Sequence, residues 1–240
     1  MRKTITLIII FLSVFYGYSQ TNELDSLSIQ LAYQNQDSLK VETSLNLIKS
    51  LYSIKDYDRA LKYIIASEEL SNNLNYSIGI AEVTYYKSLV FAQKNDYINA
   101  ISGYSKSKDL FKKLNDTLSI AKVNNSIGLI EIKRGNYVKG LQYLLSAIKA
   151  LESKGLKNEL RLAYCNLAKA YYNIEAFDES IVFNLKALQV QEQLNDIDGI
   201  NQSNSQLAEL YSMKKEHRKA IEYYKKVLKG LSTNNDSIRG

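Results

Sequence analysis

Few residues in this 240-residue sequence have side chains suited to catalysis. His217 is the only histidine and Cys165 the only cysteine, so neither a histidine-based metal cluster nor a Ser-His-Asp triad can be assembled. The Ser-x-x-Lys spacing of some serine hydrolases occurs without a companion Lys-Thr-Gly motif, at Ser105, Ser119, Ser146 and Ser212. The glycines are dispersed and form no phosphate-binding loop. The sequence predicts no enzyme, no cofactor and no metal.

Basic charge is concentrated near the C-terminus. The formal net charge is +6, and residues 211–230 contain seven basic and two acidic side chains. A nucleic-acid-binding surface needs basic side chains that follow the phosphates along a groove, which a single charged segment does not supply. We therefore expect no nucleic-acid partner. The basic segment is predicted to be a solvated face, with contact to an acidic partner or anionic lipid as the alternative.

The first twenty residues have the features of a secretory signal peptide. Arg2 and Lys3 precede an apolar run from Ile5 to Tyr16, and small or polar residues follow up to Gln20. The run is shorter than the roughly 20 residues that a helix needs to span a bilayer. The sequence predicts export to the periplasm or the extracellular space with cleavage beside Gln20, and an uncleaved anchor is the alternative.

A forty-residue period organises the rest of the chain. Five segments align without gaps, beginning at Lys55, Asn95, Gly135, Glu175 and Lys215. The sixth residue of each segment is small, and this small column consists of Ala60, Ala100, Gly140, Ser180 and Ala220. Apolar residues recur at three- and four-residue spacing on both sides of the break, which predicts two helices per period. Because one helix pair cannot bury its apolar faces alone, we expect the pairs to stack into a solenoid.

The period also predicts boundaries. Residues 21–37 would form an N-terminal capping helix, residues 38–234 five repeats, and residues 235–240 the truncated start of a further repeat. The five repeats would span about 38–75, 76–115, 116–155, 156–195 and 196–234. Side-chain oxygens are placed to cap the second helices at Asp56, Asp96 and Asn136. The small column is expected where the two helices of a pair cross most closely.

These units resemble tetratricopeptide repeats. The aliphatic and small pair of the family's first helix is present at Ile127-Gly128, Leu167-Ala168 and Leu207-Ala208. The family's Trp and terminal Pro are missing, Glu131 replaces an expected aromatic, and the period is longer than usual, as in some exported bacterial signalling and scaffold proteins. The resemblance implies an all-α fold, a right-handed superhelical α-solenoid of stacked antiparallel helix pairs.

The resemblance also implies a binding surface on the inner face, lined by the first helix of each unit. By the family's geometry, the inward positions are Tyr52, Tyr85, Leu89, Asn125, Leu129, Lys169, Tyr172 and Glu209. Tyr and Leu would supply apolar contact area, and Asn and Lys would hydrogen-bond an extended backbone. The alternative is that Leu89 and Leu129 belong to the core. The implied partner is a protein or peptide.

Two functions remain open from the sequence. The favoured one is a non-enzymatic binding module outside the cytoplasm, acting as a scaffold or as the sensory N-terminal part of a bacterial signalling protein. The alternative is a structural accessory subunit of an envelope complex. Nothing after the helix carrying Ile221, Tyr224, Val227 and Leu228 covers that apolar face. We therefore expect either a longer protein, with a downstream membrane or signalling domain that would tether it, or self-association through the C-terminal repeat.

Overall fold

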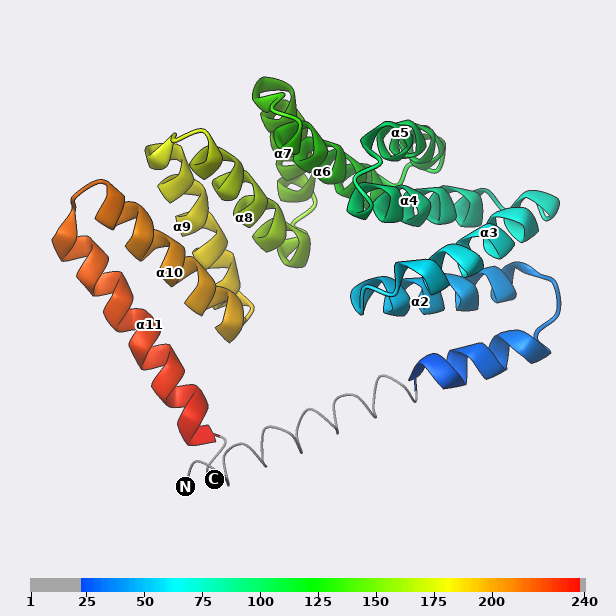
Figure 1. Cartoon of the computed structure of the whole chain (residues 1–240), viewed down its shortest axis with the longest axis horizontal. Helices are drawn as coiled ribbons and strands as arrows, with labels where there is room; N and C mark the ends of the chain where they lie inside the picture. Colours follow the sequence, from blue (N-terminus) through cyan, green and yellow to red (C-terminus); the bar gives the residue numbers. More distant parts are fainter. Residues whose placement is uncertain (1–22, 238–240) are drawn as a thin grey trace. The chain divides into compact units, whose positions relative to one another are not determined.

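The computed structural model describes residues 23–237, and the side chains of residues 23–230. Every regular element in this range is an α-helix, and no strand occurs in it (Figure 1). The helices divide into two compact units, one ending at Asn115 and one beginning at Asp116. The all-α solenoid class that the repeat predicts is confirmed. The predicted signal peptide lies outside the described residues.

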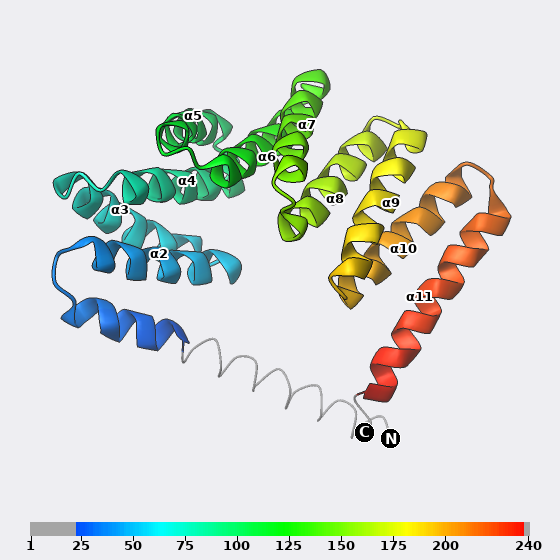
Figure 2. The same ribbon diagram turned by 180° about the vertical axis from the view of Figure 1, so that it is seen from behind.

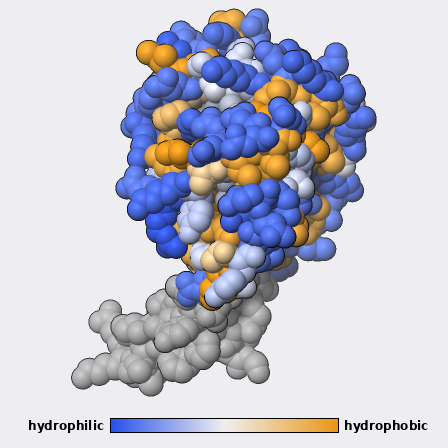
Figure 3. Space-filling model, turned by 90° about the vertical axis from the view of Figure 1, so that its right-hand side faces the viewer, coloured by the Kyte–Doolittle hydropathy of each residue, from blue (hydrophilic) through white to orange (hydrophobic). Residues whose placement is uncertain are grey.

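Unit 1 contains two helix pairs and a preceding helix over residues 23–33. The pairs are α2 (Ser38–Ser53) with α3 (Tyr57–Asn73), and α4 (Ser77–Gln93) with α5 (Tyr97–Lys113). Each helix packs on the next, and α2 also contacts α4, so the first helices of consecutive pairs lie side by side. The apolar residues Leu24 and Leu31 of the first helix are buried against the core of this unit. In the view of Figure 3, apolar patches alternate with hydrophilic ones.

Unit 2 contains three helix pairs (Figure 2). They are α6 (Thr117–Lys133) with α7 (Tyr137–Ser153), α8 (Lys157–Asn173) with α9 (Phe177–Gln193), and α10 (Ile197–Met213) with α11 (His217–Ser237). Each helix again packs on the next, and α6 also contacts α8. The largest core of this unit lies between α6, α7, α8 and α9 and includes Leu144, Ala147 and Leu167.

The connections between helices have one repeated geometry. From α2 to α11, each has three residues, and the middle residue has a positive φ. These middle residues recur every twenty positions: Lys55, Asn75, Asn95, Asn115, Gly135, Gly155, Glu175, Asn195 and Lys215. A left-handed residue just after a helix lets the following N–H groups bond back to the last turn, as Asp56 N does to Leu51 O at 3.0 Å.

The helix N-termini confirm two of the three predicted caps. Asp56 Oδ1 accepts a hydrogen bond from Arg59 N, and Asp96 Oδ1 accepts one from Asn99 N, each at 3.2 Å. The prediction for Asn136 is wrong, because its side chain makes no cap bond. Its Nδ2 donates instead to Glu131 Oε2 at 2.7 Å, and this charge-assisted bond orients the amide toward the end of α6.

The small column lies where paired helices cross, as predicted. Ala60 and Ala100 are fully buried, and Ser180 is buried with its Oγ donating to Ala168 O at 2.9 Å. A Cβ added to Gly140 would lie 2.9 Å from the carbonyl oxygen of Gly128 on the facing helix. Larger side chains at this column would therefore separate the two helices of a pair.

The last helix is longer than the others. α11 continues to Ser237 and passes through Asn235 and Asp236, where the spacing of the earlier turns predicts the next connection. The predicted boundary at residue 235 thus does not coincide with a helix end. The assignment of repeat boundaries stays a prediction.

Candidate interaction surfaces

The two residues with the most reactive side chains are His217 on α11 and Cys165 on α8. His217 is exposed in the first turn of α11. Cys165 is half-buried, and burial raises the pKa of its thiol, so the thiol remains protonated at neutral pH. In the described part of the chain, no group of three or more His, Cys, Asp or Glu side chains is placed to hold a metal ion. No helix between residues 23 and 237 is long and apolar enough to cross a membrane.

Glu131 forms a buried ion pair at the position where the family has an aromatic residue. Its Oε1 lies 2.7 Å from Lys139 Nζ on α7, and Oε2 accepts the hydrogen bond from Asn136. Burial would raise the pKa of Glu131, but the hydrogen bonds from Lys139 and Asn136, together with the charges of Lys139 and Arg134, outweigh it and lower the pKa. The carboxylate thus stays ionised and links the end of α6 to the start of α7.

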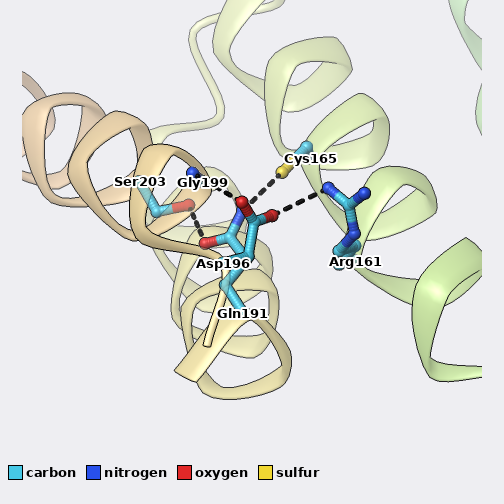
Figure 4. A network of polar contacts seen from close by, with 6 residues as sticks. All are labelled: Arg161, Cys165, Gln191, Asp196, Gly199 and Ser203. Atoms are coloured by element: carbon cyan, nitrogen blue, oxygen red, sulfur yellow. Dashed lines mark hydrogen bonds and ion pairs between the residues drawn. The ribbon is translucent and has the colours of Figure 1, made fainter. Parts of the chain in front are cut away.

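A second polar network joins α8, α9 and α10 (Figure 4). Arg161 Nη1 lies 2.8 Å from Asp196 Oδ2, and Asp196 Oδ1 accepts from Gly199 N at 3.1 Å to cap α10. Beside this pair, Gln191 Oε1 accepts from Ser203 Oγ at 2.7 Å, and Gln191 Nε2 points to Cys165 Sγ at 3.5 Å. These interactions are satisfied within the fold, so we assign the network to the packing of consecutive pairs.

The predicted binding residues of unit 1, together with two residues that were not predicted, Tyr86 and Gln93, lie on a surface that we call the tyrosine face: Tyr52, Tyr85, Tyr86, Leu89 and Gln93. Tyr86 links the other two rings, with centroids 6.4 Å from Tyr52 and 5.4 Å from Tyr85. Tyr52 Oη accepts a hydrogen bond from Gln93 Nε2 at 2.9 Å, which joins α2 to α4. All except Gln93 are half-buried. The rings therefore present an edge to solvent while their other parts pack between helices.

The tyrosine face carries hydroxyl and amide groups, and the carboxylate at its edge, Glu82, is paired with Lys49. Burial raises the pKa of Tyr52 and of Tyr86, so both phenols are neutral and can donate or accept hydrogen bonds. At its edge, Lys49 Nζ lies 3.1 Å from Glu82 Oε2 and 5.8 Å from the centroid of the Tyr86 ring. The face combines aromatic area with hydroxyl and amide groups, the composition of protein-binding surfaces.

The predicted binding residues of unit 2, together with Asn166, which was not predicted, lie on a surface that we call the polar face: Asn125, Leu129, Asn166, Lys169, Tyr172 and Glu209. Asn125 Oδ1 accepts from Asn166 Nδ2 at 3.1 Å, which joins α6 to α8. Tyr172 Oη donates to Glu209 Oε1 at 2.9 Å, which joins α8 to α10. Lys169 is exposed, whereas Leu129 is half-buried and packs against the core, so the alternative core role of Leu129 is partly correct.

Three residues of these faces were missing from the sequence prediction: Tyr86, Gln93 and Asn166. Gln93 follows Tyr52 by 41 residues, and Asn166 follows Asn125 by the same interval. One repeat plus one residue is therefore a recurring spacing at which side chains of consecutive first helices meet, and Tyr172 meets Glu209 at a different one, 37 residues. The 41-residue interval could have been sought in the sequence once the forty-residue period was known. The functional role of the predicted binding residues stays a prediction.

The stacked antiparallel helix pairs define a repeat protein of the helical solenoid class. Within that class, the family model for the tetratricopeptide repeat matches residues 159–232. The resemblance to tetratricopeptide repeats is thereby confirmed, by sequence in this segment and by fold over most of the chain. No curated protein sequence matches the chain.

Solved structures resemble this fold over most of its length. BtubC (BKLC) from P. vanneervenii aligns with 15% identity and a TM-score of 0.74, covering 91% of this chain and 90% of that one. A signal transduction ATPase with numerous domains and a tetratricopeptide repeat sensor, from Pyrococcus horikoshii, aligns with 20% identity and a TM-score of 0.71. That alignment covers 85% of this chain but 32% of the ATPase. A Rap protein complexed with Competence and Sporulation Factor aligns with 18% identity, a TM-score of 0.68, and 85% and 58% coverage.

Proposed function

We propose that this protein is a non-enzymatic binding module that takes a protein or peptide segment on the first-helix faces of its repeats. The observation that carries the proposal is the tyrosine face, whose partly exposed rings and hydroxyl are already packed and hydrogen-bonded between α2 and α4. Binding to a surface that is ordered beforehand loses little further side-chain entropy, which favours affinity.

The polar face supports the same function with different groups. Asn125, Asn166 and Lys169 carry amide and ammonium groups at a surface shared by α6 and α8. Such groups hydrogen-bond the backbone of an extended segment without requiring a particular sequence. The polar face would therefore bind mainly main-chain groups, and the tyrosine face would bind mainly apolar side chains.

The proposal extends to signalling and to location. One structural relative carries its tetratricopeptide repeats as a sensor and another is complexed with a signalling factor, which supports a sensory or scaffold role here. Arg2, Lys3 and the apolar run from Ile5 to Tyr16 support action outside the cytoplasm. Intact-mass measurement of the exported protein should show loss of the first 19 or 20 residues, and retention of the apolar run would contradict cleavage.

Site-directed photo-crosslinking in cells that produce the protein tests the binding proposal. We would place a photo-reactive residue at Tyr85 on the tyrosine face, at Lys169 on the polar face, and at the exposed Lys106 and Lys149 on second helices as matched controls. We expect a partner to be captured from each of the two face positions and not from the controls. Equal capture from all four positions would contradict the assignment.

Alanine substitution then measures the contribution of each face to binding of the captured partner. Tyr85→Ala and Tyr172→Ala should weaken binding more than Lys106→Ala and Lys149→Ala. Lys112 on α5 and Lys186 on α9 also lie on second helices. Lys186 is unsuitable as a control, because its Nζ lies 5.4 Å from the Tyr164 ring centroid and 5.3 Å from that of Phe183.

A further inference from the structure

The outer face of α11, which we call the bare face, is exposed to solvent. The corresponding face of the earlier second helices is buried. One position of the second helix recurs every forty residues as Ile64, Tyr104, Leu144, Asn184 and Tyr224. The first four of these side chains are at most 2% exposed, whereas Tyr224 is 47% exposed. Ile181 and Leu188 on α9 are each 8% exposed, but their counterparts Ile221 and Leu228 are 54% and 67% exposed. In the described part of unit 2, α11 has substantial packing only against α10 (Figure 2).

Basic side chains accompany this bare face. Arg218, Ile221, Lys225 and Leu228 follow one another at three- and four-residue spacing, so they form one stripe along the helix. Two neighbouring lysines are engaged within the fold, Lys219 with Glu216 at 2.7 Å and Lys226 with Glu222 at 3.1 Å. Arg218 and Lys225 make no ion pair with the described residues, so their charges are available to an occupant.

The opposite end of the described chain has the complementary character. In the helix over residues 23–33, Leu24 and Leu31 are buried, but Ile29 is 61% and Tyr33 is 87% exposed. Asp25, Ile29 and Tyr33 recur at four-residue spacing and form one stripe. Residues 23–39 contain three acidic side chains and no basic one, and the following Lys40 points its Nζ to Gln34 O at 3.3 Å.

From these two stripes we propose that copies of this protein associate head to tail, with α11 of one copy packed against the helix over residues 23–33 of a second copy. Each stripe pairs exposed apolar residues with charge, and the signs are opposite, so the contact gains both apolar burial and charge complementarity. Pairing of α11 with a second α11 would instead bring Arg218 and Lys225 against their own copies. This heterologous contact joins unlike surfaces, so it propagates along a row of copies unless the row closes into a ring. It uses neither the tyrosine face nor the polar face and is independent of the proposed function.

Analytical ultracentrifugation of the purified protein over a range of concentrations and salt tests the association. The weight-average mass should rise with protein concentration beyond that of a dimer and should fall as NaCl is added, because exposed charges are screened. A monomer at all concentrations up to about 1 mM would overturn the proposal.

Two variants that introduce a charge of the opposite sign into each stripe distinguish the head-to-tail contact from other modes. Leu228→Glu blocks the C-terminal stripe and Ile29→Lys blocks the N-terminal one; each variant alone should be monomeric. An equimolar mixture should form a heterodimer and nothing larger, because one functional stripe of each kind remains. Dimerisation of the Ile29→Lys variant on its own would show a symmetric contact through α11 and would overturn the proposal.

The matched control is Val138→Glu, since Val138 is 74% exposed on α7 and lies on neither stripe. This variant should associate like the unsubstituted protein. All three positions are exposed, so circular dichroism and thermal midpoints should be unchanged, which separates lost contacts from lost folding. Association that survives Leu228→Glu in a folded protein would also overturn the proposal.

Discussion

In unit 1 the first helices of consecutive pairs meet through aromatic rings as well as a side-chain hydrogen bond, and in unit 2 they meet through side-chain hydrogen bonds. Tyr52 reaches α4 by its ring contact with Tyr86, whereas Asn125 reaches α8 by its amide contact with Asn166. Tyr85 and Asn125 occupy equivalent positions one repeat apart, and Tyr86 and Asn166 occupy equivalent positions two repeats apart. The repeat therefore specifies where the helices lie and leaves the chemistry of their exposed face free to change along the chain.

The interiors of the two units also differ in the kind of polar side chain that they bury. The contacts between helices in unit 2 include a buried carboxylate at Glu131 and the buried amides of Asn184 and Gln191. The buried polar side chains of unit 1 are mostly hydroxyls, such as Ser67, whose Oγ donates to Ser44 Oγ at 2.6 Å. Unit 2 thus buries more amide and carboxylate groups, whose hydrogen bonds are costly to lose when one partner is removed.

Among the substitutions that test this comparison, we expect the largest loss of stability from overpacking of the small column, which both units share. Ala100→Leu should reduce the free energy of unfolding by about 1–3 kcal/mol, and Gly140→Leu by at least as much, because even a Cβ there meets a facing carbonyl. Urea unfolding of the purified protein measures both. The exposed substitutions Ser105→Leu and Gln142→Leu on the same helices are the controls. Neutral results at the buried positions would mean that the column is not an interhelix contact.

Glu131 tests the dependence of unit 2 on polar burial. Glu131→Gln should cost about 1–2 kcal/mol at pH 7, since it removes the charge that holds Lys139. Because folding lowers the pKa of Glu131 below its ordinary value of 4.5, the contribution is complete above that pH and is lost as pH falls through the folded-state pKa. Unfolding at pH 7 and at pH 3 should therefore show a smaller difference between the two proteins at pH 3. A pH-independent difference would point to packing alone. The position forty residues earlier holds Phe91, so unit 1 offers no equivalent charge.

Glycine substitutions in the turns should change the free energy of unfolding by similar amounts in both units. Lys55→Gly and Glu175→Gly should each raise the free energy of unfolding by about 0.5–1 kcal/mol, because a side chain is strained at φ of 64° and 61°. Asn95→Gly should change little, since asparagine tolerates this conformation, and Gly135→Ala should destabilise. Thermal unfolding checks the four variants. A gain confined to one unit would show that the units differ in their turns as well as in their faces.

The smallest effects come from the contacts that define the faces. A double-mutant cycle of Tyr52→Phe with Gln93→Ala, and another of Asn125→Ala with Asn166→Ala, should each give a coupling of about 0.5 kcal/mol, because the bonds are partly exposed. Parallel unfolding curves of the single and double variants provide the values. No coupling in either cycle would mean that the faces are held by the cores beneath them.

Periodicity made the fold predictable from the sequence. The small column of Ala60 and its successors, together with the polar breaks, marks every helix pair because an interhelix crossing excludes large side chains whatever the neighbours are. The faces were less predictable. Tyr85 and Tyr172 follow from register, but Gln93 and Asn166 depend on which side chain of the next helix is within reach, and that requires the offset between helices. Asn136 shows a further limit, since a competing acceptor five residues earlier changes the role that its own type predicts.

The constant length of the connections has a consequence for how this sequence can change. Since each linker places its left-handed residue at the same twenty-residue step, cutting at two points forty residues apart leaves a linker of the same length with a left-handed residue at the same place. Duplication or loss of a whole repeat would thus preserve every helix crossing at the new seam, whereas a twenty-residue change would exchange the roles of first and second helices. Recombination between repeats is a low-cost route to longer or shorter versions of this protein, each with a different order of tyrosine and amide surfaces.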